Sequence, residues 1–212
     1  MPKRPRPALA SRKQPRQARS AQLVDDVLEA AARVLRRVGA RRFTTVRVAE
    51  EAGVSVGSLY QYFPNKEALL FRLQSDEWRD TGALLDEILH DPRREPLDRL
   101  RRAVRVFFRS ELEEAELRVA LDDAGALFRD APEARAHMSL VTTRMLAFID
   151  EALPGVPAKK RAFAADVVMT SMAAIGEKIT EQRRTRAEVD AWAVVVAEML
   201  CRFLEDLTRP RA

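Results

Sequence analysis

The stretch TTVRVAEEAGVSVGSLYQYFPNKEALL, residues 44–70, decides how the surrounding chain folds. Its pattern predicts a helix over residues 46–52 and a second helix over residues 56–63, followed by a third that begins near the end of the stretch. Gly53 suits the left-handed turn that ends the first helix, and Ser55 can cap the second. This succession of helix, glycine, buried aliphatic residue, cap and helix is typical of a helix-turn-helix.

The apolar positions of the first two helices separate an inner face from an outer one. In the first helix Val48 packs inward, which leaves Glu50 and Glu51 pointing outward. In the second helix Leu59 and Phe63, four residues apart, share the inner face. The side chains that remain for the outer face are those of Val56, Gly57, Ser58, Tyr60, Gln61 and Tyr62.

The ends of these helices carry groups that suit a phosphate. Either Thr44 or Thr45 stands at the N-cap of the first helix, where a hydroxyl and free backbone N–H groups are good phosphate ligands. Lys66 falls in the first turn of the third helix, which begins near Asn65, and a cation there is unfavourable to the helix dipole. A phosphate held jointly by the lysine and the helix N–H groups would remove this conflict. We therefore expect the unit to grip a DNA backbone.

Composition indicates an all-α, soluble protein. Of the 212 residues 47% are apolar and 33% are charged, which excludes disorder and leaves charge for solvated helix faces. Glycine is scarce, with 7 residues, which favours helix throughout. The longest strongly apolar run, residues 191–197, is far shorter than the roughly 20 residues that a membrane helix needs. No targeting segment follows the basic N-terminus, so we expect no membrane association.

Other classes of protein and site are disfavoured by the residues that are scarce. The single Cys201 excludes an internal disulfide and a cysteine-cluster metal site, and it suits a reducing cytoplasm. The 2 histidines form no metal-binding pair, and no glycine-rich phosphate loop is present. We therefore expect no enzyme, no cofactor and no metal, although a small ligand-binding enzyme remains an alternative.

Charge is distributed unevenly along the chain. Residues 1–74 hold 15 Lys and Arg against 6 Asp and Glu, a net charge of +9, whereas the remainder holds 22 against 26, a net charge of −4. A basic end joined to a neutral or acidic domain is the electrostatic pattern of a nucleic-acid-binding domain. Basic tails without nucleic acid also occur, so charge alone leaves both interpretations open.

Three segments follow from these patterns. Residues 1–19 hold seven Lys and Arg, four prolines and no acid, and we expect a disordered basic arm that either lies on DNA or only aids solubility. Residues 20–66 form the helix-turn-helix domain, whose first helix Ser20 can cap and Gly39 ends. Residues 67–212 form a second, helical domain.

The second domain is expected to consist of helices that prolines separate. The helix that begins near Asn65 runs, with a weak point at Gly82, until Pro92. Thr185 and Glu188 form a capping box for the last helix. The remaining helices are predicted roughly over residues 97–112, 117–128 with a break near residue 125, 132–153, 158–183 and 186–207.

One family shares the pattern of the helix-turn-helix. The run A-x-x-A-G-V-S-x-G-x-L-Y-x-Y-F-x-x-K-x-x-L, from Ala49 to Leu69, resembles the DNA-binding domain of the TetR family of bacterial transcriptional regulators. The similarity extends from about Ser20 to Leu70, and more than ten fixed positions match without a gap. It implies an N-terminal three-helix DNA-binding domain and a C-terminal helical domain for effector binding and dimerisation.

The resemblance also implies roles for single residues on double-stranded DNA. Phosphate contacts would come from Thr45, Ser58, Tyr60, Tyr62 and Lys66, whereas Val56, Gly57 and Gln61 would face base edges. The amide of Gln61 suits adenine, and Val56 could meet a thymine methyl. The alternative for Tyr60 and Tyr62 is ordinary packing with the hydroxyl at the surface.

For the second domain the resemblance implies a dimer and an effector pocket. The last two helices would form the seam of a homodimer through Ala173, Gly176, Trp192, Val196, Met199 and Phe203, although part of each stripe must serve the intrachain core. A pocket for an apolar effector could be lined by Phe107, Phe108, Phe128, Met138, Val141, Met145, Phe148, Met169 and Met172. Alternatively, these residues could belong to the core alone. Polar groups that could orient a ligand are His137, Asp166 and Glu177, with a solvated surface as the alternative.

These patterns together predict a sequence-specific, DNA-binding transcriptional regulator. We expect a repressor that binds a palindromic operator as a homodimer and is released by a small apolar or amphipathic effector. The alternatives are an activator, or an architectural protein that binds DNA or a partner protein without a small-molecule effector.

Overall fold

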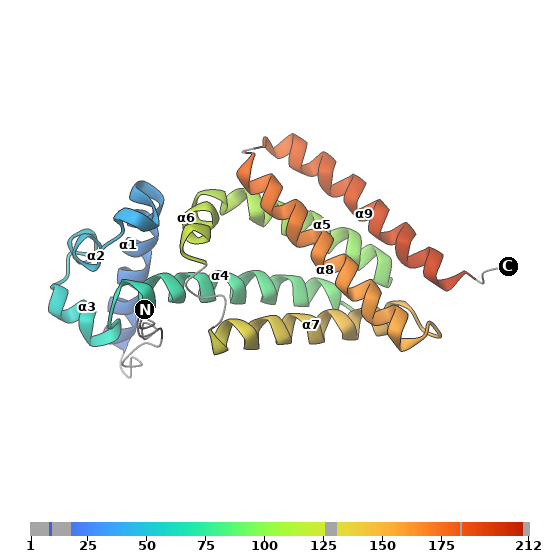
Figure 1. Ribbon diagram of the computed structural model, residues 1–212, viewed down its shortest axis with the longest axis horizontal. Helices are drawn as coiled ribbons and strands as arrows, with labels where there is room; N and C mark the ends of the chain where they lie inside the picture. Colours follow the sequence, from blue (N-terminus) through green and yellow to red (C-terminus); the bar gives the residue numbers. More distant parts are fainter. Residues whose placement is uncertain (1–8, 10–17, 126–130, 183, 210–212) are drawn as a thin grey trace, which may run out of the picture. The chain divides into compact units, whose positions relative to one another are not determined.

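The computed structural model describes residue 9 and residues 18–125, 131–182 and 184–209. These residues form helices and no strand, which confirms the predicted all-α class (Figure 1). The helices are α1 (Ala18–Arg42), α2 (Thr45–Ala52), α3 (Val56–Tyr62), α4 (Lys66–Leu89), α5 (Pro96–Glu113), α6 (Ala115–Gly125), α7 (Pro132–Ala152), α8 (Ala158–Glu181) and α9 (Arg186–Thr208). The expected arm lies almost wholly outside the described residues.

Most helix ends follow the local signals in the sequence, and two do not. α1 already includes Ala18, so Ser20 lies within the helix and is not its cap. Gly39 leaves the helical region with φ 70° and ψ 165°, but a last helical turn continues to Arg42. The backbone hydrogen bonds can resume after a kink because glycine takes a positive φ without a steric cost. Gly82 does not interrupt α4.

The contacts between residues divide the chain into two compact units. The first unit comprises residues 1–77 and 116–131, and the second comprises residues 78–115 and 132–212. The division falls within α4, eleven residues beyond the boundary expected from the sequence, and it assigns α6 to the first unit. An ion pair of 2.5 Å between Glu77 of α4 and Arg118 of α6 lies within that unit.

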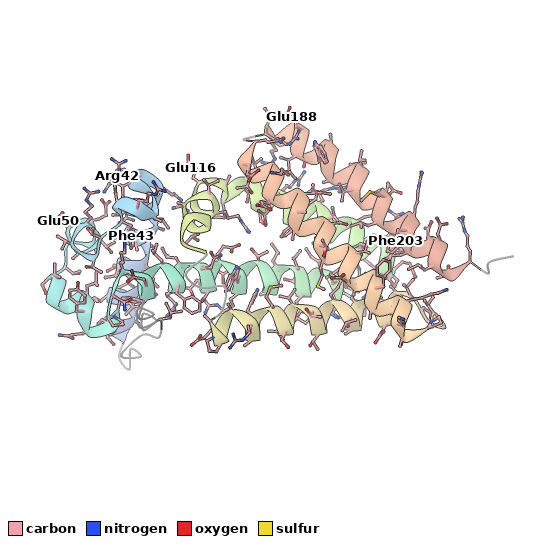
Figure 2. The ribbon with its side chains drawn as sticks, in the orientation of Figure 1. Arg42, Phe43, Glu50, Glu116, Glu188 and Phe203 are labelled. Atoms are coloured by element: carbon pink, nitrogen blue, oxygen red, sulfur yellow. The ribbon has the colours of Figure 1, made fainter. Side chains whose placement is uncertain are left out.

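The first unit buries large apolar side chains of its own. Figure 2 shows Phe43 directed into this unit, whereas Arg42 and Glu50 extend from its surface. Leu59 and Phe63 are at most 1% exposed, as expected for the inner face of the helix-turn-helix, and Phe43 is also fully buried. The burial of large apolar side chains holds the short helices α2 and α3 in place, since helices of 8 and 7 residues are not stable alone.

The second unit packs α5 against both α8 and α9, with α7 against α8. Its core contains Phe108 and Phe148, both fully buried. The helices α5 and α8 approach closely at Gly176, where an added Cβ atom would lie 3.0 Å from the Phe107 ring. The capping box expected at the start of α9 is present.

A buried arginine joins three helices of the second unit. The guanidinium of Arg99 on α5 donates to the carbonyl of Leu89 at the end of α4, at 2.8 Å, and forms an ion pair with Glu151 of α7. Burying a cation is tolerated here because it is both paired and hydrogen-bonded. Within the described part of the chain, no helix is long and apolar enough to cross a membrane.

Candidate DNA-binding site

The two threonines at the N-terminus of α2 occupy different positions. Thr44 is the N-cap, and its side chain accepts a hydrogen bond of 3.3 Å from the backbone N–H of Arg47. Thr45 is the first residue of the helix and is only 7% exposed. Its Oγ1 atom lies 3.0 Å from the phenol oxygen of Tyr60 on α3. Gly53 ends α2 in the left-handed conformation, with φ 67° and ψ 26°, as its sequence position predicted.

The start of α3 is fixed by a second pair of hydroxyls. Ser55 is the N-cap, and its Oγ accepts a hydrogen bond of 3.0 Å from the backbone N–H of Ser58. The two serine Oγ atoms are themselves 2.8 Å apart. Gly57 lies beside them, and an added Cβ atom there would meet only the Ser55 Oγ, at 3.7 Å. The backbone at this end of α3 is therefore open to close approach.

The residues expected on the outer face of α3 differ in exposure. Gly57, Tyr60 and Gln61 are exposed, and Val56 and Ser58 are half-buried. Tyr62, in contrast, is buried, with 7% of its surface exposed. Packing therefore accounts for most of the Tyr62 side chain, which was the alternative interpretation of this residue.

The start of α4 carries the lysine that was expected to contact a phosphate. Lys66 is the first residue of the helix and is half-buried. Asn65 caps the helix, because its Oδ1 accepts a hydrogen bond of 2.7 Å from the backbone N–H of Ala68. Sequence reasoning missed this cap, although an asparagine directly before a helix is a strong signal for one.

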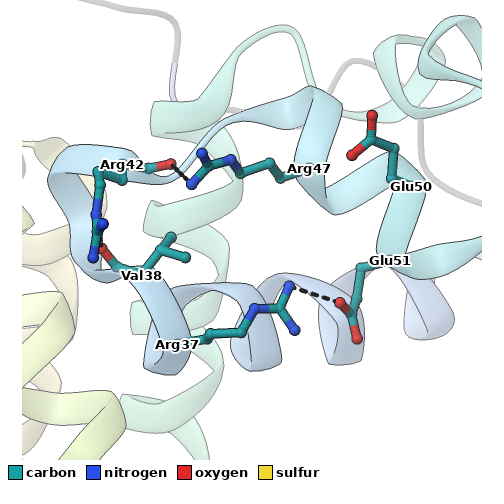
Figure 3. A pocket seen from close by; sticks show the side chains of 6 residues that line it. All are labelled: Arg37, Val38, Arg42, Arg47, Glu50 and Glu51. Carbon is teal, nitrogen blue, oxygen red and sulfur yellow. Dashed lines mark hydrogen bonds and ion pairs between the residues drawn. The ribbon is translucent and has the colours of Figure 1, made fainter.

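A group of arginines and glutamates joins α1 to α2 around an open hollow of about 600 Å³ (Figure 3). Arg37 pairs with Glu51 at 2.8 Å, and Arg33 pairs with the same carboxylate at 3.2 Å. Arg47 donates to the carbonyl of Arg42 at 3.2 Å. The Arg47 contact holds the first half of α2 against the end of α1, and the two Glu51 pairs hold the C-terminal end of α2 against an earlier part of α1.

The position of Glu51 corrects the sequence prediction, which directed this side chain outward. It faces α1 because Arg33 and Arg37 are four residues apart and share one side of that helix. Their hydrogen bonds, first that of Arg37 and then that of Arg33, lower the pKa of Glu51 below its usual value of 4.5. The paired spacing of the two arginines was visible in the sequence, but the partner that they would meet was not.

The residues expected to line an effector pocket mostly lie in the core of the second unit. Phe108 and Phe148 are fully buried, and Met145 and Met172 are 7% and 6% exposed. Phe107 and Met169 pack against the same core, and Val141 is half-buried. Met138 is exposed instead, at 58%, and Phe128 lies outside the described residues. The buried members form one packed apolar cluster.

The residues expected at a dimer seam separate into two groups. Ala173, Trp192 and Met199 are exposed, and Phe203 is half-buried. Gly176 and Val196, however, are buried within their own chain, and Gly176 is covered by Phe107 and Glu111. Their surfaces are not accessible to a second copy.

The three polar groups considered for ligand orientation also lie in the second unit. Asp166 and Glu177 are exposed on α8. The ring of His137 stacks on that of Trp78, with centroids 5.0 Å apart and planes inclined by 12°. Burial, and to a smaller extent the charge of Arg144, lowers the pKa of His137 below 6.5.

Two family models match the chain. Residues 27–73 match the model of bacterial regulatory proteins of the tetR family, and residues 95–207 match that of the tetracyclin repressor-like C-terminal domain. The second match alone spans more than half of the 212 residues. No curated protein matches the chain in sequence.

Solved structures share the fold over almost the whole chain. The TetR family repressor AlkX from Dietzia sp. strain DQ12-45-1b, implicated in biodegradation of n-alkanes, is 21% identical, covers 92% of this chain and 100% of its own, and has a TM-score of 0.55. Thermus thermophilus FadR, solved with lauroyl-CoA, is 20% identical, with coverages of 89% and 96% and a TM-score of 0.57. The fatty acid degradation regulator FadR from Bacillus halodurans is 17% identical, with coverages of 89% and 97% and a TM-score of 0.62. At these identities the likeness concerns the fold.

Proposed function

The chain belongs to the TetR family of bacterial transcriptional regulators, and we propose that it is a homodimeric repressor that a small apolar or amphipathic molecule releases from its operator. Membership of this family makes it a DNA-binding regulator and not an enzyme. The observation that carries the proposal is the exposed side of α3. The Ser55–Ser58 hydroxyl pair lies at the start of this helix, the Thr45–Tyr60 pair links it to the start of α2, and Lys66 follows it at the start of α4.

On this surface phosphate contacts position the domain and base contacts select the sequence. Ser58, Tyr60 and Lys66 supply hydroxyl or ammonium donors for the DNA backbone, and Tyr62 offers only its small exposed remainder. Gly57, with Val56 and Gln61 beside it, allows α3 to come close to the floor of a major groove, because no side chain stands between the backbone and the bases. Few base-reading side chains remain, so the shape and stiffness of the operator add to its selection.

The homodimer is supported by an apolar stripe on α9 that its own chain leaves partly uncovered. Trp192, Val195 and Met199 are 40%, 67% and 49% exposed, and their spacing of three and four residues places them on one side of the helix. A second copy would cover this stripe together with Ala173 on α8. Two helix-turn-helix units would then read half-sites about 34–36 Å apart, or a multiple of that spacing.

The effector class is supported by the apolar core around Phe108, Met145 and Met172 and by the apolar compounds associated with two similar structures. The core offers aromatic and flexible methionine side chains, which adapt to an apolar chain. One relative is solved with lauroyl-CoA and another is implicated in n-alkane biodegradation. These side chains are packed against one another, so a ligand must open the core in order to bind. The ligand would then bind the opened state in preference to the packed state, and this difference in affinity is what a two-state switch requires.

An operator-release assay tests this function. The wild-type protein first selects its operator from random duplex DNA, and lauroyl-CoA, free laurate and dodecane are then titrated into the complex. Release by an apolar-chain compound, with thermal stabilisation of the free protein by that compound, supports the proposal. Stabilisation without release contradicts the switch, and binding to many unrelated sequences without any response favours the architectural alternative.

A further inference from the structure

The hydroxyls of Thr45 and Tyr60 form one hydrogen-bonded pair, although they are 15 residues apart in the sequence and come from different helices. Their oxygens are 3.0 Å apart, a normal hydrogen-bond distance. The two residues differ in exposure, since Thr45 is 7% and Tyr60 is 39% exposed. Only Tyr60 therefore presents a substantial part of its surface to solvent.

The number of protons limits what such a pair can donate. Each hydroxyl has one proton to donate, and a hydrogen bond between two hydroxyls uses one of the two protons. One proton is left for an anion outside the pair. Two independent phosphate contacts from Thr45 and Tyr60 would require that this hydrogen bond be broken.

Exposure decides which hydroxyl keeps the free proton. Thr45 is covered, so its proton is best used on the phenol oxygen of Tyr60. Tyr60 is exposed, and its phenolic hydroxyl is a good donor to an anionic oxygen. A donor that already accepts a hydrogen bond on its oxygen is polarised and donates more strongly.

We propose that the Thr45 side chain contacts no phosphate itself and instead acts through Tyr60: the Thr45 hydroxyl donates to the Tyr60 oxygen, and the Tyr60 hydroxyl donates to a backbone phosphate. Thr45 is thus a positioning residue for the DNA contact of α3. The inference rests on the proposed function, and it replaces two separate phosphate contacts by one relay that joins the start of α2 to α3.

A double-mutant cycle on operator binding tests the relay. Thr45→Val keeps the shape and removes the hydroxyl, and it should weaken binding about threefold per protomer, whereas Tyr60→Phe removes the phosphate donor and should weaken it about tenfold. The double variant should bind no worse than Tyr60→Phe, because the Thr45 hydroxyl has no other route to the DNA and the substitution leaves the backbone unchanged. Thr45→Ser retains the hydroxyl and should restore wild-type affinity. A structural defect at the start of α2 would not follow this pattern.

Ser58→Ala provides the matched control. It removes a hydroxyl from the other pair, so its effect and that of Thr45→Val should multiply. None of these variants changes a charge, and the salt dependence of binding should therefore stay at its wild-type slope.

Three results would overturn the relay. They are a Thr45→Val effect that persists in the Tyr60→Phe background, a Thr45→Val loss larger than that of Tyr60→Phe, or no loss at all. The same cycle is run on the free energy of unfolding without DNA, where coupling shows the pair itself. A wild-type protein that shows this coupling but selects no DNA contradicts the proposed function, and the relay falls with it.

Discussion

The exposed side of α3 and the exposed side of α9 present opposite chemistry, and they were not equally readable from the sequence. On α3 a glycine, a glutamine and hydroxyl groups face solvent, and caps within a few residues hold the helix start. On α9 a tryptophan, a valine and a methionine face solvent, and no local signal separates them from the buried residues of the same helix. Local hydrogen bonds place the first surface, whereas packing between distant helices places the second.

The largest effect is expected where α8 passes α5. Gly176→Leu should lower the free energy of unfolding by about 3 kcal/mol, because even a Cβ atom at this position lies 3.0 Å from the Phe107 ring and overpacking forces the helices apart. Urea unfolding at several protein concentrations measures the loss, which should not depend on concentration. Ala162→Leu, at an exposed position of α8, is the control and should change stability by less than about 0.5 kcal/mol. A loss that grows on dilution would instead place Gly176 between two copies of the chain.

The second prediction concerns the apolar stripe of α9. Met199→Glu should raise the dimer dissociation constant about a hundredfold, since the carboxylate would be buried in the seam without a partner. Sedimentation equilibrium measures the change. Val194→Glu is a sharp control, because Val194 is 51% exposed, as Met199 is at 49%, but lies about 140° around the helix. Equal effects of the two substitutions would show that the stripe is not the seam.

The third prediction returns to the α3 region and its phosphate contacts. Lys66→Ala should weaken binding to all DNA sequences alike, about tenfold at low salt, and reduce the slope of log affinity against log salt by about one per protomer. Fluorescence anisotropy at several salt concentrations measures both. Lys159→Ala, an exposed lysine of α8 with the same change of charge, should leave the slope unaltered. An unaltered slope for Lys66→Ala would remove this residue from the DNA contacts.

The fourth prediction separates base reading from backbone contact. Gln61→Ala should change the preference at one base position of each half-site by about threefold and leave the other positions as they are, because only one amide is lost. Sequencing of selected operators gives the preference at every position. The Lys66→Ala profile, which should keep the wild-type preferences, is the comparison. A profile identical to wild type for Gln61→Ala would mean that Gln61 reads no base.

The smallest effect concerns the ion pairs of Glu51 with Arg33 and Arg37, which join α2 to α1. Because Arg37 and Arg33 lower the pKa of Glu51 below 4.5, the ionised carboxylate contributes its full stabilisation above pH 4.5 and loses it as the pH falls through the lower folded-state pKa. The difference in melting temperature between wild type and Glu51→Gln should therefore be constant above about pH 5 and shrink below pH 4.5. Glu50→Gln, one residue away and exposed, should show no such trend. A difference that persists unchanged at pH 3 would contradict the role of the ionised carboxylate.

Much of the helix-turn-helix could be predicted because its signals act over three or four residues. The cap at Ser55 and the left-handed turn at Gly53 lie where the sequence indicated, as does the cap of α9 at Thr185 in the second unit, since each depends on backbone groups nearby. Ser20 was assigned wrongly as a cap because the chain before it is helical from Ala18, which no cap signal announces.

For the second unit the sequence predicted a set of candidate residues but not which of them belong to the core, to a ligand pocket or to a dimer interface. Apolar residues at helical spacing are equally suited to a core, a ligand and a partner, so Phe108, Met138 and Gly176 could not be separated by pattern. Contacts between helices made Phe108 core, left Met138 exposed and placed Gly176 against α5.

The sequence by itself determined an all-α chain, a helix-turn-helix with its turn and most of its caps, and the family to which the chain belongs. Only the tertiary structure decided that Thr45 meets Tyr60, that Glu51 faces Arg33 and Arg37, and that the stripes of α8 and α9 divide into buried and exposed residues. The physical reason is range: helix and turn signals are hydrogen bonds between near neighbours, whereas these contacts join helices whose approach depends on how the whole core packs.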